Sequence, residues 1–193
     1  MWERIVTRKY GTKAVVIGGK TAMQKAKPEL ETAIRGSKVE IVDYIWYGGD
    51  SNYENIEKLK ANETVQNADM LFGVGGGRAC DTVKTLADML DKPFFTFPTL
   101  ASNCAACTAI TVIYNADGSF KEYYYMHGPA YHTFVNTKII ADSPEKLLWA
   151  GIGDALSKEC EVLFASRDKF IYHTPLMGQC VAKVCTTPLI EYG

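Results

Sequence analysis

Three consecutive glycines offer the clearest chemistry in this sequence. They stand in the run Gly73-Val74-Gly75-Gly76-Gly77-Arg78, between a predicted buried strand and a predicted helix. Glycines in such a turn let the backbone approach a ligand closely, and the free amides at a helix N-terminus attract an anion. The run therefore predicts a site for a nucleotide pyrophosphate, although a merely tight strand–helix turn would give the same pattern. Its spacing is neither G-x-G-x-x-G nor that of the P-loop.

Cysteine and histidine are the other residues that could do chemistry. Cys104-Ala105-Ala106-Cys107 is a C-x-x-C motif, but no second pair accompanies it, so neither a zinc site nor redox work is favoured. His127 and His132 lie near predicted turns, where surface histidines are common, and His173 stands at a predicted helix start.

Alternating strand and helix patterns must position these residues. Short apolar runs bounded by turn residues predict strands, and longer periodic segments between them predict helices, the first with Pro28 as a break or restart. This βαβ rhythm is typical of a Rossmann-like α/β domain, a parallel sheet covered by helices on both faces. The predicted strands are 13–17, 39–42, 69–74 and 93–97, and the predicted helices are 21–35, 52–62 and 78–90.

The pattern changes after Pro98. Residues 109–114 and 122–125 are β-rich and flank Asn115-Ala116-Asp117-Gly118, which predicts an inserted β-hairpin, and Phe134-Val135 predicts one more strand. From Ser143, a predicted N-cap followed by Pro144, the pattern is helical. We therefore expect an α/β domain at 1–142 and, at 143–193, the incomplete beginning of an all-helical domain.

Incomplete helical packing should leave apolar faces exposed and promote self-association. The residues expected on these faces are Leu163, Phe164, Ile171 and Val181.

Composition narrows the class of protein. The chain has 193 residues, 47% of them hydrophobic and 22% charged, and a net charge of −1, so it lacks the positive field that nucleic acids attract. No apolar run is long enough for a membrane span, and the first residues lack a signal-peptide core. Cys80 falls in a predicted helix, and Cys160, Cys180 and Cys185 fall in helical patterns expected to be half-buried. Reduced thiols and a cytoplasmic location are therefore expected.

Four separated motifs together resemble one known family. They are the pattern GGG-x-x-x-D that ends at Asp81, the segment 98–102, the segment 108–114 and the segment 151–156. In order and spacing they resemble the glycerol dehydrogenase branch of the iron-containing alcohol dehydrogenases, over about 13–193. The resemblance implies that family's two-domain architecture, shared with dehydroquinate synthase and here truncated.

The resemblance also implies roles for individual residues. Asp81 matches the acid of the glycine motif and is expected to help bind the cofactor, although by itself it is an acid in the first turn of a helix, where it favours the helix dipole. Asp154 matches the first metal ligand, although by itself it is a helix-surface acid between small residues. The residues that match cofactor contacts are Gly75, Gly76, Gly77 and Arg78 at the pyrophosphate, Thr99 and Ser102 along the cofactor, and Thr108, Ile110, Val112 and Tyr114 around the nicotinamide.

The implied activity is hydride transfer between a small alcohol or polyol and NAD or NADP, assisted by a divalent metal, zinc or iron. Family members use two further histidine ligands that lie beyond this chain, so we expect the chain alone to be inactive, and the full protein to be a homo-oligomer. Two alternatives remain: a non-catalytic dinucleotide-binding module, and a lyase like dehydroquinate synthase. The segment 108–114 favours the dehydrogenase branch.

Two positions depart from the family pattern. NAD-selective members place an acid after the first strand, whereas this chain has Gly18-Gly19-Lys20. Losing the acid removes repulsion of a 2′-phosphate, and Lys20 could pair with it unless it is only a solvated loop residue. NADP is therefore expected to be accepted. At the catalytic site, Cys104 replaces an aspartate that contacts the polyol, which argues against glycerol itself as the substrate.

Overall fold

The computed structural model describes residues 10–167 and 172–193, and these form two compact units. The first unit comprises residues up to Leu100 and the segment Cys104–Ser143. The second comprises Ala101–Asn103 and Pro144–Gly193. Each unit is described by itself.

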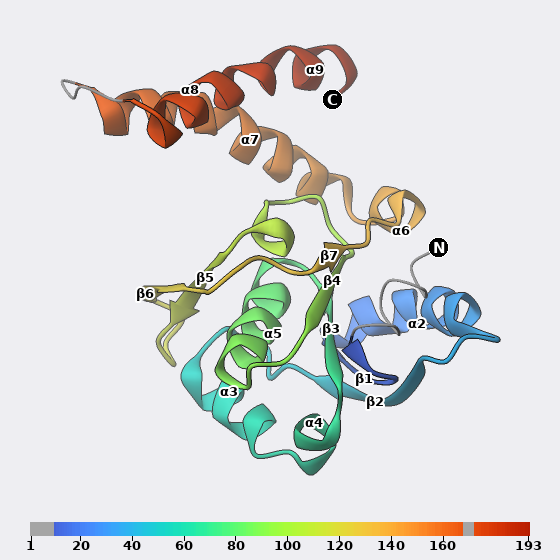
Figure 1. The fold of residues 1–193 in the computed structure, drawn as a ribbon. Helices are drawn as coiled ribbons and strands as arrows, with labels where there is room; N and C mark the ends of the chain where they lie inside the picture. The colour runs from blue at the N-terminus through green and yellow to red at the C-terminus, as the bar shows by residue number, and fades with distance from the viewer. Residues whose placement is uncertain (1–9, 168–171) are drawn as a thin grey trace. The chain divides into compact units, whose positions relative to one another are not determined.

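A five-stranded parallel sheet forms the centre of the first unit (Figure 1), which confirms the predicted α/β class. The strands lie in the order β2-β1-β3-β4-β7, and every neighbouring pair runs parallel. Their bounds are β1 Lys13–Gly18, β2 Glu40–Trp46, β3 Met70–Gly75, β4 Phe94–Pro98 and β7 His132–Thr133.

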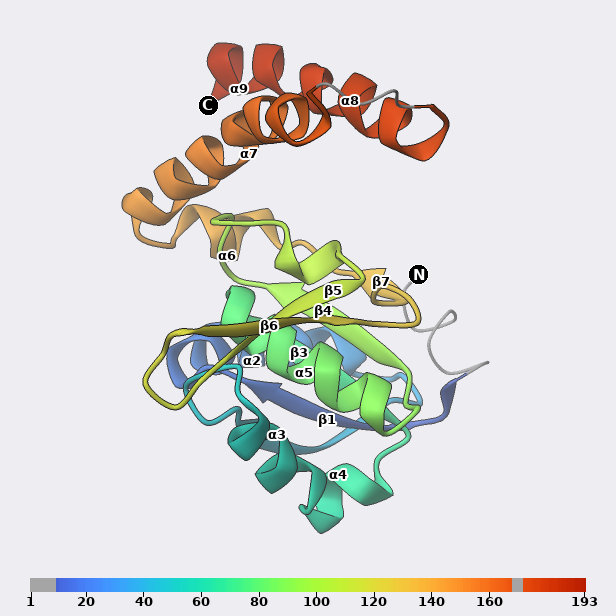
Figure 2. The same ribbon diagram turned by 90° about the vertical axis from the view of Figure 1, so that its left-hand side faces the viewer.

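Helices cover both faces of this sheet (Figure 2). Helix α2 (Lys20–Ile34) packs on one face, and α3 (Tyr53–Lys60), α4 (Glu63–Asn67) and α5 (Gly77–Met89) pack on the other. Successive strand residues alternate between the two cores, as the pleat requires: Val15 and Ile17 face α3 and α5, whereas Ala14 and Val16 face α2. The continuous apolar runs follow from this double burial.

The strand order reverses at β1, because β2 lies on one side of it and β3 on the other. In open parallel sheets such a reversal opens a crevice at the carboxyl ends of the two strands, where ligands bind. Here those ends are the first glycine turn, at Gly18-Gly19, and the triple-glycine turn.

Several predicted boundaries were wrong. Helix α2 continues through Pro28, because burial of Ala26 and Leu30 against the sheet outweighs the cost of losing the backbone hydrogen bond that a proline cannot donate. The helix expected over 52–62 ends at Lys60, because the side chain of Asn62 caps the separate helix α4.

The predicted hairpin is present as β5 (Ile110–Tyr114) and β6 (Phe120–Tyr125). The strand expected at Phe134-Val135 is instead β7, two residues earlier, where His132 and Thr133 pair with β4. His132 is therefore a half-buried strand residue rather than a surface turn residue. A short helix, α6 (Thr137–Ala141), follows.

The second unit consists mainly of α7 (Glu145–Ser166), α8 (Thr174–Val184) and α9 (Thr186–Tyr192). Ser143 does not cap α7: Pro144 holds the N-cap position, and a proline side chain can accept no hydrogen bond. Cys160, Cys180 and Cys185 are exposed rather than half-buried, because these helices cover only part of one another's surface.

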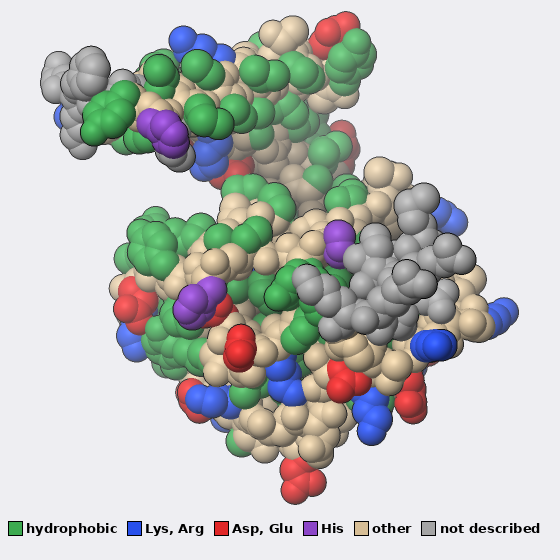
Figure 3. All heavy atoms as spheres, in the orientation of Figure 1, with side chains coloured by type: hydrophobic (Ala, Val, Ile, Leu, Met, Phe, Trp, Pro, Cys, Tyr) green, Lys and Arg blue, Asp and Glu red, His purple; other side chains and the backbone are tan. Residues whose placement is uncertain are grey.

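Large apolar side chains are exposed on these helices (Figure 3), as expected for Leu163, Phe164 and Val181; Ile171 lies outside the described residues. No helix in the described part of the chain combines the length and apolarity needed to cross a membrane.

Candidate functional site

Close backbone approach explains the glycines at the ends of β1 and β3. A side chain on Gly18 would place its Cβ 2.1 Å from the carbonyl oxygen of Val74, and one on Gly75 would meet the Cβ of Ala79 at 2.9 Å. Gly75 also has a backbone φ of +146°, which residues with a side chain rarely adopt. The amide of Gly19 donates to the carbonyl oxygen of Val74 at 3.3 Å, which joins the two turns.

Two helices begin at these turns. Gly19 is the N-cap of α2 and Gly76 the N-cap of α5, and neither helix has a side-chain cap or an acid in its first turn. The amides of both first turns therefore keep their partial positive charge without a side-chain partner. Two such helix ends beside one crevice suit a ligand that carries two adjacent phosphates.

Arg78 joins the triple-glycine turn to the loop after β2. Its guanidinium lies 3.2 Å from Asp50 and stacks over the ring of Tyr114, 4.6 Å from the ring centroid. The backbone is joined as well, because the amide of Tyr114 donates to the carbonyl oxygen of Ser51 at 2.8 Å. Arg78 and Tyr114, predicted from separate motifs, are therefore in contact.

Asp81 has a different position from the one expected. It lies in the second turn of α5, outside the reach of the helix dipole at the first turn, and it is buried. One carboxylate oxygen pairs with Lys84 at 3.1 Å, and the other accepts the amide of Val112 at 3.2 Å. Burial raises the pKa of Asp81, while Lys84 and the Val112 amide oppose that rise.

Lys84 is the residue that sequence reasoning missed. Its ammonium is fully buried and, besides Asp81, donates to the carbonyl oxygens of Ala105 and Ile110 at 2.6 and 2.8 Å and to the hydroxyl of Thr108 at 3.2 Å. The available signal was the charged i,i+3 pair of Asp81 and Lys84. Asp81 and Lys84 thus hold the segment that contains the predicted nicotinamide contacts.

The predicted contacts on β5 share one side of the strand. Ile110, Val112 and Tyr114 are half-exposed, while Thr111 and Ile113 between them are buried against the first unit. This alternation leaves one face of β5 available to a ligand.

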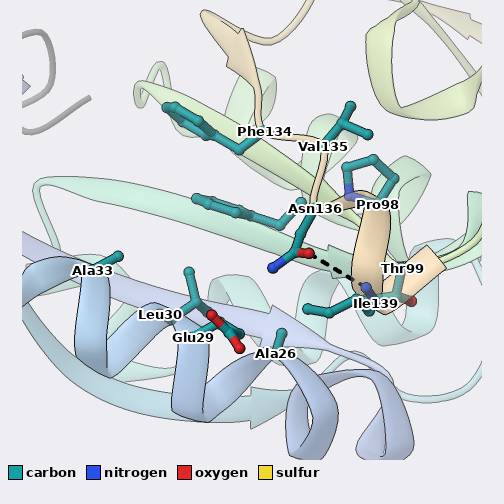
Figure 4. A pocket seen from close by; sticks show the side chains of 11 residues that line it. Ala26, Glu29, Leu30, Ala33, Pro98, Thr99, Phe134, Val135, Asn136 and Ile139 are labelled. Atoms are coloured by element: carbon teal, nitrogen blue, oxygen red, sulfur yellow. Dashed lines mark hydrogen bonds between the residues drawn. The ribbon is translucent and has the colours of Figure 1, made fainter. Parts of the chain in front are cut away.

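A mainly apolar cavity of about 260 Å³ opens beside the end of β4 (Figure 4). Helix α2 forms one wall with Ala26 and Leu30, and the segment after β7 forms the other with Val135 and Ile139. Thr99 lines the cavity, and its amide donates to the carbonyl oxygen of Gly75 at 3.2 Å, so the cavity borders the glycine turn.

Lys20 is the first residue of α2, not a loop residue, and its side chain is exposed. Its ammonium lies 4.7 Å from the ring centroid of Trp46, the last residue of β2. A cation over an exposed aromatic ring contributes only ~0.5–1 kcal/mol, so a phosphate can displace the ring as partner.

The remaining predicted site residues are Cys104, Ser102 and Asp154. Cys104 is exposed and precedes the 3₁₀ turn η1 (Ala105–Cys107). Ser102 and Asp154 belong to the second unit, where Gly151 lets α7 approach the loop: a Cβ there would lie 1.6 Å from the carbonyl oxygen of Ala101. Asp154 pairs with Lys158 at 3.2 Å, and no cluster of three metal-ligating side chains occurs within residues 10–167 and 172–193.

The sheet order and the paired glycine turns define an open parallel α/β fold in which the strand order reverses at β1. A model of the iron-containing alcohol dehydrogenases matches residues 4–135, and the chain belongs to that family.

The chain is similar to several glycerol dehydrogenases. It is 32% identical over 185 residues to one from Escherichia coli O6:H1, covering 93% of this chain and 50% of that one. It is 35% identical over 151 residues to one from Thermotoga maritima, covering 76% and 41%. The crystal structure of the Schizosaccharomyces pombe glycerol dehydrogenase superposes with a TM-score of 0.82 at 26% identity, covering 99% of this chain and 49% of that one. The chain thus spans about half the length of these relatives.

Replacing Gly75 by alanine should destroy the turn. The strained φ costs ~1–3 kcal/mol, and the added methyl group displaces Ala79, so NADH affinity should fall about tenfold or more. Fluorescence titration with NADH and chemical denaturation measure both effects. Gly118→Ala is the control, because Gly118 has φ +81° but open space around it; equal losses of affinity in both variants would contradict a role for the turn.

Breaking the buried pair should be costly. Lys84→Met leaves the Asp81 carboxylate buried without its cation, which should lower the free energy of unfolding by about 3–5 kcal/mol. The double variant Asp81→Asn/Lys84→Met should lose less than the sum of the single losses, because the two residues act together. Denaturant titration of all four proteins measures this coupling. Lys58→Met is the matched control, since it breaks the exposed pair with Glu54 and should change stability little. Additive losses would show that the pair is not coupled.

Proposed function

We propose that this chain is the dinucleotide-binding part of an oxidoreductase that transfers hydride between a small alcohol or polyol and NAD or NADP. The observation that carries the proposal is the pair of uncapped helix N-termini at the strand-order reversal, each preceded by a glycine turn. Membership of the iron-containing alcohol dehydrogenase family, and relatives named as glycerol dehydrogenases, support the reaction class.

The cofactor is proposed to extend across the carboxyl ends of the sheet. Its pyrophosphate would bind the amides at Gly75–Gly77, where the first turns of α2 and α5 offset the negative charge. Its nicotinamide would lie along the half-exposed face of β5, near Tyr114. Its adenine would enter the cavity beside Thr99. The volume of this cavity is smaller than the ~300–1,000 Å³ that a whole ligand needs, and it suits one flat ring.

In this proposal a bound nicotinamide would supply the hydride acceptor or donor, and the protein's own residues would bind and orient it. Asp81 and Lys84 fix the β5 segment, so the face that meets the nicotinamide is held in one position before the ligand arrives. Arg78 and Asp50 link that face to the pyrophosphate turn.

The proposed metal has one candidate ligand in this chain, Asp154. A catalytic zinc generally takes three protein ligands, and the described residues gather no such set around Asp154. The described part of the chain therefore does not fit a metal by itself, and no step is assigned to one. This leaves a second candidate function, a dinucleotide-binding module without catalysis. Turnover assays of this chain with alcohols, either cofactor and added zinc or iron distinguish the two: metal-dependent turnover would exclude the non-catalytic module.

The substrate is proposed to be a small alcohol or polyol other than glycerol. A thiol at Cys104 cannot provide the charge-assisted hydrogen bond that a carboxylate accepts from a hydroxyl group. The exposed apolar faces of α7, α8 and α9 support self-association of the chain.

NADPH should bind at least as tightly as NADH. Lys20 stands at the start of α2, no acid occupies the first turn, and the ammonium is free to pair with a 2′-phosphate. Lys20→Glu should weaken NADPH binding about tenfold, equivalent to ~1.4 kcal/mol, and change NADH binding little. Titration of both cofactors measures the ratio. Lys25→Glu, an exposed site on the same helix, is the control; a strong NADH preference in the unaltered protein would refute the assignment.

Filling the cavity should displace the adenine. Val135→Trp adds a large ring at a half-exposed position of the cavity wall, so it should weaken binding of both cofactors about tenfold without lowering the melting temperature. Val184→Trp, at an exposed position on α8, is the control. Unchanged affinity in Val135→Trp would place the adenine elsewhere.

A further inference from the structure

Cys104 and Cys107 lie at the two ends of one tight turn. The amide of Cys107 donates to the carbonyl oxygen of Cys104 at 3.1 Å, and the Cys107 thiol donates to the same oxygen at 3.2 Å. Both side chains are exposed, while Ala106 between them is buried.

The turn geometry suits a disulfide. A 3₁₀ turn has three residues per turn and rises ~2.0 Å per residue, so residues three apart face the same side with Cα atoms ~6 Å apart. Disulfides span Cα separations of ~4.4–6.8 Å. Cys180 and Cys185, also both exposed, are five residues apart at the end of α8, where α-helical geometry turns their side chains ~140° apart.

The backbone of the turn is fixed from its inner side. Lys84 donates to the carbonyl oxygen of Ala105 at 2.6 Å, and Thr96 and Thr133 donate to that of Ala106 at 2.8 and 3.2 Å. These bonds involve none of the cysteine side chains, so the two sulfur atoms can join by side-chain rotation while the turn keeps its anchors.

We propose that Cys104 and Cys107 form a reversible intramolecular disulfide by exchange with a small disulfide such as glutathione disulfide. One cysteine thiolate attacks a glutathione sulfur, forming a mixed disulfide and releasing one glutathione thiolate. The second cysteine thiolate then attacks the protein sulfur of that mixed disulfide and releases the other. The protein loses two thiol protons and two electrons, and glutathione disulfide is reduced to two glutathione molecules.

The proposed function gives this disulfide a consequence, which rests on that proposal. Cys104 stands at the position proposed to meet the substrate, whereas the glycine turns that hold the pyrophosphate are separate from η1. Oxidation should therefore change the position at which the substrate binds. It should alter NADH affinity by no more than about twofold relative to the reduced protein, well below a tenfold loss, which corresponds to ~1.4 kcal/mol.

The experiment treats the whole chain with glutathione disulfide, blocks the remaining thiols with an alkylating reagent and maps the peptides by mass. The expected result is a peptide containing Cys104 and Cys107 that is lighter by two hydrogens and carries neither glutathione nor the blocking group. Cys160, Cys180 and Cys185 should carry glutathione as mixed disulfides. Cys80 should be unmodified, because burial raises the pKa of its thiol to about 12.

Single variants provide the matched controls. In Cys107→Ser and in Cys104→Ser the remaining cysteine should keep a glutathione adduct, because no neighbouring thiol resolves it, and dithiothreitol should reverse every product. Glutathione on both Cys104 and Cys107 of the unaltered protein, or both thiols still free while Cys160 is modified, would overturn the proposal. NADH titration before and after oxidation separates the two proposals: absence of binding in both states would remove the proposed function and leave the disulfide standing.

Discussion

The close contact between the ends of β1 and β3 is the constraint on which the candidate site depends. Parallel pairing brings the backbone at Gly18 so near the carbonyl oxygen of Val74 that no side chain fits between them. Only glycine satisfies this geometry, and a turn built from glycine has no side chain to cap the helix that follows. This contact joins the two strands tightly, and the glycines that follow as N-caps, Gly19 and Gly76, leave the first-turn amides of α2 and α5 without a side-chain cap.

A second constraint, the burial of Lys84, fixes the position of β5 in the hairpin relative to α5. The buried ammonium of Lys84 would be very unfavourable without partners, and its four acceptors compensate for lost hydration. Two of those acceptors, on Ala105 and Thr108, lie between β4 and β5, and a third is on Ile110, the first residue of β5, so α5, which begins at the glycine turn, also sets the position of β5. Asp81 consequently positions β5 through Lys84 and the amide of Val112.

The sequence was sufficient to predict the strands, which follow a regular residue pattern, and the turns that only glycine can form. Short apolar runs bounded by turn residues predicted strands near their observed bounds, and the glycine runs predicted the turns. It was insufficient where distant residues decide: Lys84 is defined by partners more than 20 residues away, and β7 by its pairing with β4. The proline prediction failed at Pro28, because tertiary packing outweighs local preference. The capping prediction failed at Ser143, because α7 begins one residue later and Pro144 holds the N-cap position.

The two units differ in how many of their charged and apolar side chains find partners within the same unit. In the first unit the sheet is covered on both faces and the site residues Asp81, Lys84 and Arg78 all have charged partners within it. In the described part of the second unit, Asp154 pairs with Lys158, and the helices expose large apolar side chains. The Lys158 ammonium beside Asp154 repels a metal cation until further acidic or imidazole ligands outweigh that repulsion. Apart from Ser102, the proposed dinucleotide contacts therefore lie in the first unit, whereas the proposed metal-assisted chemistry requires ligands that the described chain does not assemble around Asp154.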